Sequence, residues 1–170
     1  MIRVTEDRLE TIAVEAVMRA IGSDLAPVNA VSRDVAWAAG ADMEERLLKI
    51  GPLPLGGAVI TPAGDLPADF LIHVVVMSED EPQTPMTVRR AMKNGLRRAS
   101  DWAIDSLAVP PLGLGVGLVE PEESARVLVE ILLSHVDEGQ PPLDVKIAVE
   151  SKYEVDLFER LLGEMSRDGH

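Results

Sequence analysis

Strand-like and helix-like patterns of hydrophobicity alternate along this chain, and the alternation limits the folds open to it. The run from residue 70 to 77 is rich in β-branched residues and predicts a central strand. The segment from residue 87 to 105 repeats its apolar residues at helical spacing. Strands that alternate with helices indicate right-handed crossovers and a mostly parallel sheet covered on both faces. We therefore predict a three-layer α/β/α fold that binds ligands at the carboxyl ends of its strands.

The same periodicity predicts the other elements. Further strands are expected at residues 14–20, 58–61, 106–109 and 144–149, and helices at 33–50, 87–105, 122–136 and 153–165. Gly51, with prolines soon after it, is the expected end of the helix over 33–50. The apolar face of the helix over 87–105 should consist of Val88, Ala91, Met92, Leu96, Ala99 and Trp102. With 170 residues, we expect one domain over 1–170.

Composition narrows the class of function. The chain has no cysteine, so a disulfide framework, a thiolate metal site and a cysteine nucleophile are all excluded. Its net charge is -13, from 16 basic and 29 acidic residues, which disfavours nucleic acid and anionic lipid surfaces as partners. Charged residues near Met1 argue against a signal peptide, and the nearly uncharged run 106–119 is too short to span a bilayer. We expect a cytoplasmic protein.

A glycine-rich segment carries the strongest hint of chemistry. The predicted strand that ends at Val109 runs into a loop with Gly113, Gly115 and Gly117 at alternate positions. Such a loop can turn sharply and direct successive N–H groups at an anion, so a diphosphate is a natural ligand even for an acidic protein. A tight connection between a strand and a helix uses the same residues, so that structural alternative stays open. The P-loop and Rossmann fingerprints are both absent.

Three segments together resemble the macro domain family. They are residues 57–67, with Gly57-Ala-Val-Ile-Thr-Pro-Ala-Gly-Asp-Leu-Pro67, the run Phe70-Leu-Ile-His73, and the loop 109–117, in this order and spacing. The likeness spans roughly residues 14 to 162. It implies a mixed six- or seven-stranded sheet between helices, and ADP-ribose or a derivative as ligand. Two loops of the family hold the diphosphate of that ligand.

The resemblance also implies the site residues. The second diphosphate loop falls on Leu112, Gly113, Leu114, Gly115, Val116 and Gly117. The first loop falls on residues 27–30, where Pro27 lacks the N–H that a glycine would offer. Arg19 and Asn29 are expected to line the pocket in place of lost amides, with ordinary loop hydrogen bonding as the alternative, and Val31 opens the helix after the first loop.

Catalytic residues are where the chain departs from the family. The family's Asn-Ala-Ala-Asn segment aligns with residues 19–22, so both asparagines are missing, and we assign no catalytic residue, metal ligand or cofactor. We expect His73 to be a packing residue with a satisfied ring. Ser32 and Asp34 should act as a helix N-cap and a dipole-matching carboxylate. Ser124 has no triad pattern around it and should be an ordinary helix residue.

Three hypotheses follow for the function. The first is a module that binds ADP-ribose, a related nucleoside diphosphate or an ADP-ribosylated protein, through the loop at 112–117. The second is a divergent ADP-ribosyl hydrolase, because a retained pocket shape does not exclude turnover. The third is a scaffold that binds no nucleotide and acts as a homodimer or through a partner, with Met86, Trp102 or the last helix at the interface.

Overall fold

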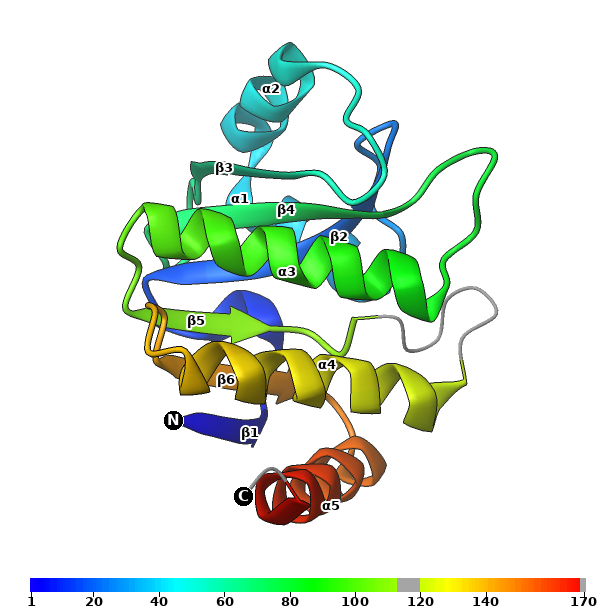
Figure 1. Ribbon diagram of the computed structural model, residues 1–170. Helices are drawn as coiled ribbons and strands as arrows, with labels where there is room; N and C mark the ends of the chain where they lie inside the picture. The colour runs from blue at the N-terminus through cyan, green and yellow to red at the C-terminus, as the bar shows by residue number, and fades with distance from the viewer. Residues whose placement is uncertain (113–119, 169–170) are drawn as a thin grey trace.

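A six-stranded sheet forms the middle layer of the computed structural model, which describes residues 1–112 and 120–168 (Figure 1). The strand order is β1-β6-β5-β2-β4-β3. The strands are β1 (Ile2–Glu6), β2 (Ala16–Gly22), β3 (Ala58–Pro62), β4 (Phe70–Met77), β5 (Ser106–Val109) and β6 (Asp144–Val149). The edge strand β3 runs antiparallel to β4, and every other pairing is parallel. The prediction of a mixed, mostly parallel sheet is confirmed.

Helices cover both faces of this sheet, as the three-layer prediction requires. They are α1 (Ala30–Ala39), α2 (Ala41–Ile50), α3 (Pro85–Asp101), α4 (Pro121–Asp137) and α5 (Lys152–Asp168), with a short 3-10 helix, η1 (Leu9–Thr11). One hydrophobic core lies between the sheet and α3, α4 and α5. A second core lies between the opposite face and η1, α1 and α2. Within the described residues, no helix has the length and apolar character needed to cross a membrane.

Strand β2 shows how the two cores divide the side chains. Successive side chains of a strand point to opposite faces. Ala16, Met18 and Ala20 accordingly belong to the core beneath α3 and α4, whereas Val17 and Ile21 belong to the core beneath α1. Arg19 lies between these last two on the same face, so its charged side chain is buried on the α1 side of the sheet.

The region between residues 30 and 50 differs from the prediction. A single helix over 33–50 is wrong, because the chain forms α1 and α2 with a break at Gly40, whose φ is 99°. Only glycine adopts such a φ without strain. The predicted end at Gly51 is confirmed, with φ of 84°. Strand β1, which the periodicity did not predict, pairs with β6 at the edge of the sheet.

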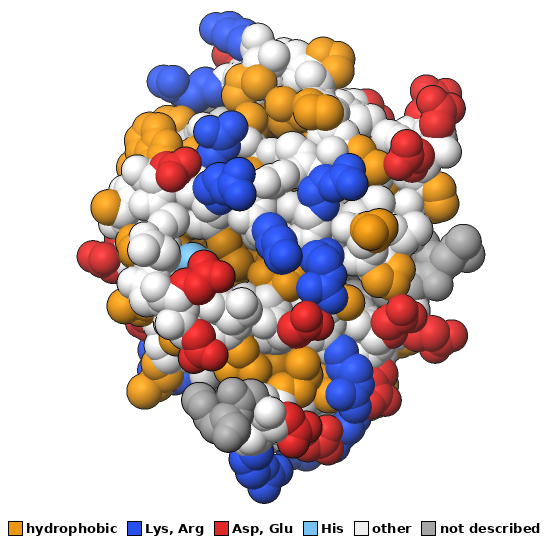
Figure 2. All heavy atoms as spheres, viewed as in Figure 1, with side chains coloured by type: hydrophobic (Ala, Val, Ile, Leu, Met, Phe, Trp, Pro, Cys, Tyr) orange, Lys and Arg blue, Asp and Glu red, His pale blue; other side chains and the backbone are white. Residues whose placement is uncertain are grey.

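Helix α3 matches the predicted apolar face except at its end. Trp102 was expected in that face, but it is 57% exposed and meets the ring of Phe70 edge-on, at 5.5 Å between ring centroids. The other five residues of the predicted face are buried. Basic side chains gather on the outer side of α3 (Figure 2). Arg89 donates two hydrogen bonds to Glu130 of α4, at 3.2 and 3.1 Å, so part of this charge offsets nearby acid.

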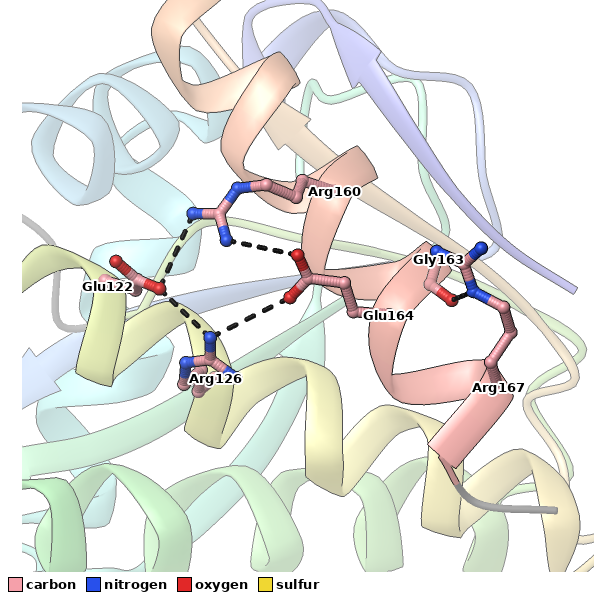
Figure 3. Close-up of polar contacts among 6 residues, drawn as sticks. All are labelled: Glu122, Arg126, Arg160, Gly163, Glu164 and Arg167. Atoms are coloured by element: carbon pink, nitrogen blue, oxygen red, sulfur yellow. Dashed lines mark hydrogen bonds and ion pairs between the residues drawn. The ribbon is translucent and has the colours of Figure 1, made fainter.

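Four charged side chains connect α5 to α4 (Figure 3). Arg126 lies 3.1 Å from Glu122 and 3.8 Å from Glu164. Arg160 lies 3.5 Å from each of the same two carboxylates. The resulting ring of alternating charge is half-exposed, so solvent screens it and each pair contributes little free energy. The buried residues Leu157, Phe158 and Leu161 contribute most of the docking of α5.

Gly64, in the turn after β3, offers a test of this packing. Its φ is 62°, and an added Cβ would overlap the carbonyl oxygen of Ala39 at the end of α1. Gly139 has a similar φ of 75° with open space around it. We expect Gly139→Ala to lower the free energy of unfolding by about 1–2 kcal/mol, from backbone strain alone. Gly64→Ala should cost about 3 kcal/mol or more, because overlap adds to strain. Urea unfolding would measure both, and equal losses would contradict the close approach.

Candidate functional site

A crevice opens in the sheet where β5 ends before its neighbour β2. The two strands pair only at Ala16 with Leu107 and at Val17 with Ala108. Pro110 and then Pro111 follow β5, and a proline has no N–H to donate to a neighbouring strand. After β5 the chain continues through α4 to β6, which lies on one side of this point in the sheet. After β2 it continues to β3 and β4, which lie on the other side. Ligands of open α/β sheets bind at such a reversal of strand order.

A cavity of about 90 Å³ occupies this crevice. It has room for several water molecules or for one group of the size of a phosphate. Its walls come from β2, from the start of α1, from the chain after β5 and from the start of α5. The lining residues are Arg19, Ala20, Asn29, Val31, Ser32, Pro110, Pro111, Leu112 and Glu154.

The cavity brings together part of the predicted site. Arg19, Asn29, Val31 and Leu112 were predicted from the sequence, and all four line it. The other predicted residues, Gly113, Leu114, Gly115, Val116 and Gly117, lie outside the described residues. Sequence reasoning missed Ser32 and Glu154 as wall residues. A signal for Glu154 was present, because Ser151 three residues earlier forms the Ser-x-x-Glu pattern of a capping box.

Asn29 builds the wall at the start of α1. Its side-chain Oδ1 accepts a hydrogen bond from the N–H of Ser32 at 2.9 Å, which makes Asn29 the N-cap of the helix. The prediction of Ser32 as N-cap is therefore wrong, because Ser32 is the third residue of the helix and is buried. Asp34 lies beyond the first turn and pairs with Arg8 at 3.3 Å, so its predicted dipole role is also wrong. Asn29 makes the ordinary hydrogen bond that was the alternative to a ligand role.

A buried hydrogen-bonded chain crosses three strands behind this wall. Arg19 Nε donates to Ser32 Oγ at 3.0 Å, and Arg19 Nη1 donates to His73 Nδ1 at 3.1 Å. Arginine has no acceptor, so Nδ1 accepts and the ring proton is assigned to Nε2. His73 Nε2 then donates to Thr61 Oγ1 at 2.9 Å, and that hydroxyl donates to the carbonyl of Pro62 at 3.1 Å. Both ring nitrogens are satisfied, as expected for a packing histidine.

Burial sets the charges of this chain of residues. Burial lowers the pKa of Arg19 to about 10, against a smaller raising effect of Glu44, so Arg19 remains a cation at neutral pH. Burial and the nearby Arg19 cation lower the pKa of His73 to about 3, so His73 is neutral. Arg19 Nη2 is buried and has no hydrogen-bond partner among the described residues. The site thus holds a positive charge with one donor nitrogen that no described residue accepts from.

Ser124 and Ser151 fix the opposite side of the cavity. Ser124, buried in α4, donates its hydroxyl to the carbonyl of Leu112 at 2.6 Å, and is thus a structural helix residue, as predicted. Ser151 Oγ accepts from the N–H of Glu154 at 3.2 Å and donates to Glu154 Oε1 at 2.8 Å. In the part of the chain that the structure describes, no group of three His, Asp or Glu side chains could hold a metal ion.

His73 gives a testable pH dependence. Its pKa is about 6.5 in an unfolded chain and about 3 in the fold. Below pH 6.5 the unfolded state therefore binds a proton that the folded state excludes, and stability should fall by about 1.4 kcal/mol per pH unit toward pH 3. His73→Gln keeps an acceptor and a donor but does not titrate, so we expect a shallower loss between pH 6 and pH 4. Urea unfolding across this range measures the slope.

His135→Gln is the matched control for that experiment. His135 lies on α4, is partly exposed and contacts the carbonyl of Pro142 at 3.2 Å. Its substitution should leave the wild-type slope in place. If His73→Gln also loses stability between pH 6 and pH 4 as steeply as wild type does, His73 does not resist protonation in the fold.

The fold has clear counterparts among known proteins. The macro domain family model matches residues 19–128. An uncharacterized protein of Aeropyrum pernix is 34% identical over 127 residues, which cover 74% of this chain and 67% of that protein. An uncharacterized protein of Mycobacterium tuberculosis is 30% identical over 124 residues, or 73% of this chain, and this match spans only about a third (34%) of its length.

Two further comparisons extend over more of the chain. An O-acetyl-ADP-ribose deacetylase of Shigella flexneri is 28% identical over 167 residues, which cover 95% of this chain and 94% of the enzyme. The crystal structure of a Trypanosoma brucei macrodomain in complex with ADP-ribose superposes with a TM-score of 0.86 at 17% identity, over 95% of this chain and 69% of that one. The match of the family model to residues 19–128 shows that this chain belongs to the macro domain family.

Proposed function

We propose that the crevice between β2 and β5 binds the diphosphate of ADP-ribose or of a related nucleoside diphosphate. One observation carries this proposal. The resemblance assigns the diphosphate to two loops, at 27–30 and 112–117, and a described residue of each, Asn29 and Leu112, lines the same cavity at the switch point of the sheet. Sequence position alone did not require them to meet.

The start of α1 supplies suitable donors for an anion. The first four N–H groups of a helix have no partner within the helix, and its N-terminal end carries partial positive charge. Asn29 uses the N–H of Ser32, whereas the N–H groups of Ala30 and Val31 belong to the same first turn. A phosphate at this position would accept from them, as at other helix N-termini. The net charge of -13 does not oppose this, because salt screens charges beyond about 10 Å.

Hydrolysis is the second candidate, and the Shigella deacetylase favours it because that match covers nearly the whole of both chains. Arg19 and Gly22 stand where the family carries asparagines, so we rank binding ahead of turnover. Incubation with O-acetyl-ADP-ribose, followed by chromatography of the products, separates the two candidates. Release of acetate at a rate proportional to protein concentration would establish the enzyme.

Free ADP-ribose and an ADP-ribosylated protein are both proposed as ligands, and a cytoplasmic location fits either.

A homodimer is also retained as a proposal. Met86 is 69% exposed and Trp102 is 57% exposed, as an interface through these side chains would need. Light scattering with and without ADP-ribose would separate a nucleotide-binding monomer from a dimer indifferent to nucleotide.

Asn29→Asp tests the diphosphate site without disturbing the helix. Aspartate caps a helix as well as asparagine does, so α1 should keep its stability. The added carboxylate would stand in the cavity wall and repel a diphosphate. We expect the affinity for ADP-ribose, measured by calorimetry, to fall by about 10-fold or more. The matched control is Gln140→Glu, which adds the same charge outside the cavity and should bind as wild type does.

A second variant tests the segment outside the described residues. Gly115→Glu should block the predicted glycine-rich cradle and abolish binding. Wild-type protein that gives no heat with ADP-ribose at millimolar concentration would reject the proposed function. Equal affinity in wild type and Asn29→Asp would show that the diphosphate binds elsewhere.

A further inference from the structure

Arg19 carries the least compensated charge of the described residues around the cavity. Its side chain is completely buried, and Nη2 has no hydrogen-bond acceptor in residues 1–112 and 120–168. Its two hydrogen-bonded partners, Ser32 Oγ and His73 Nδ1, are both neutral. Burying an ion costs several kcal/mol unless an opposite charge compensates it. A buried donor without an acceptor adds to that cost.

The surrounding carboxylates do not supply the missing charge. Glu44, on α2, favours the charged form of Arg19 through space, yet no ion pair joins them among the described contacts. Glu154 lines the cavity, and its carboxylate accepts from the hydroxyl of Ser151. Arg19 is therefore the cation of a cavity whose other described wall residues are neutral apart from Glu154. A ligand that brings negative charge would complete the arrangement.

We propose that Arg19 is a buried receptor for a phosphate oxygen of the ligand, through its unused nitrogen Nη2. This inference rests on the proposed function and adds a specificity residue to it. The ligand group must be anionic, because a neutral acceptor would satisfy the N–H and leave the charge uncompensated. The volume of about 90 Å³ suits a single phosphate-sized group. Residues of the N-cap and first turn of α1, Asn29, Val31 and Ser32, line the same cavity as Arg19.

The surrounding hydrogen bonds hold Arg19 in position before any ligand arrives. Ser32 binds Nε and His73 binds Nη1, so two bonds fix the plane of the guanidinium. His73 remains an acceptor because burial keeps it neutral. A fixed planar group loses little conformational entropy on binding, which strengthens a charge-assisted hydrogen bond. This local charge would offset the loss of a backbone donor at Pro27.

The test uses inorganic pyrophosphate, which carries the anionic group without the nucleoside. Calorimetry would measure pyrophosphate and ADP-ribose against wild type, Arg19→Met, Arg19→Lys and a control, Arg97→Met, on the exposed side of α3. We expect Arg19→Met to lose pyrophosphate binding by at least about 100-fold and Arg19→Lys by about 10-fold, because lysine keeps the charge without the fixed planar donors. Arg97→Met should bind as wild type does. Circular dichroism checks folding first, and Arg19→Lys carries the test if Arg19→Met does not fold.

The outcomes separate this inference from the proposed function. Pyrophosphate binding that depends on Arg19 supports the receptor even if ADP-ribose does not bind, in which case only the proposed function falls. Equal affinity of wild type and Arg19→Lys for both ligands overturns the receptor and leaves ADP-ribose binding intact. No pyrophosphate binding to wild type at millimolar concentration also overturns the receptor.

Discussion

The two prolines after β5 determine where this sheet opens. β5 has four residues, and its pairing with β2 ends at Ala108 and does not resume, because neither Pro110 nor Pro111 can donate a backbone hydrogen bond. β2 continues to Gly22 with β4 along its other edge. The chain after β2 folds back on the opened edge, where the N–H of Val28 contacts the carbonyl of Ala20 at 3.5 Å. The cavity, the start of α1 and the position of Arg19 all depend on this separation.

A polar cluster within the second core accompanies the opening. Arg19, His73 and Thr61 come from three adjacent strands, and all three are buried on the α1 face of the sheet. The surrounding core residues, such as Val17 and Leu71, are apolar. The bonds from Arg19 to Ser32 and His73, and from His73 to Thr61, each join one strand to another element. Burial of the Arg19 charge costs free energy, but the hydrogen bonds that come with it hold the wall of the cavity in place.

Much of the fold followed from local sequence. β4, β5 and β6 begin and end where the apolar runs predicted, because buried parallel strands consist of continuous apolar residues. The break at Gly40 was not visible, because alanines flank that glycine on both sides and favour a helix. Asp65, distant in sequence, donates its N–H to the carbonyl of Ala39 at 3.0 Å and so helps end α1 there. Tertiary contacts of this kind have no local signal.

The site could be predicted only in part from the sequence, again because tertiary contacts have no local signal. Arg19 was visible as a charge within an apolar strand, and Asn29 as a polar residue beside a predicted loop. Their actual partners lie on other elements, so the sequence could not distinguish the capping bond of Asn29 from a ligand contact. The position of Ser32 within α1, rather than before it, depends on where the helix begins, and helix ends are the least certain part of a periodic pattern.

The pairing of β1 with β6 has a consequence for the synthesis of this protein. β1 is synthesised before the other described strands, but its partner β6 follows only after the strands β2 to β5. Its apolar residues Ile2 and Val4 pack against the core beneath α3 and α4, so they stay exposed while most of the chain is translated. Of the described strands, β1 therefore waits longest for its partner, and this edge of the sheet can close only once β6 has been synthesised.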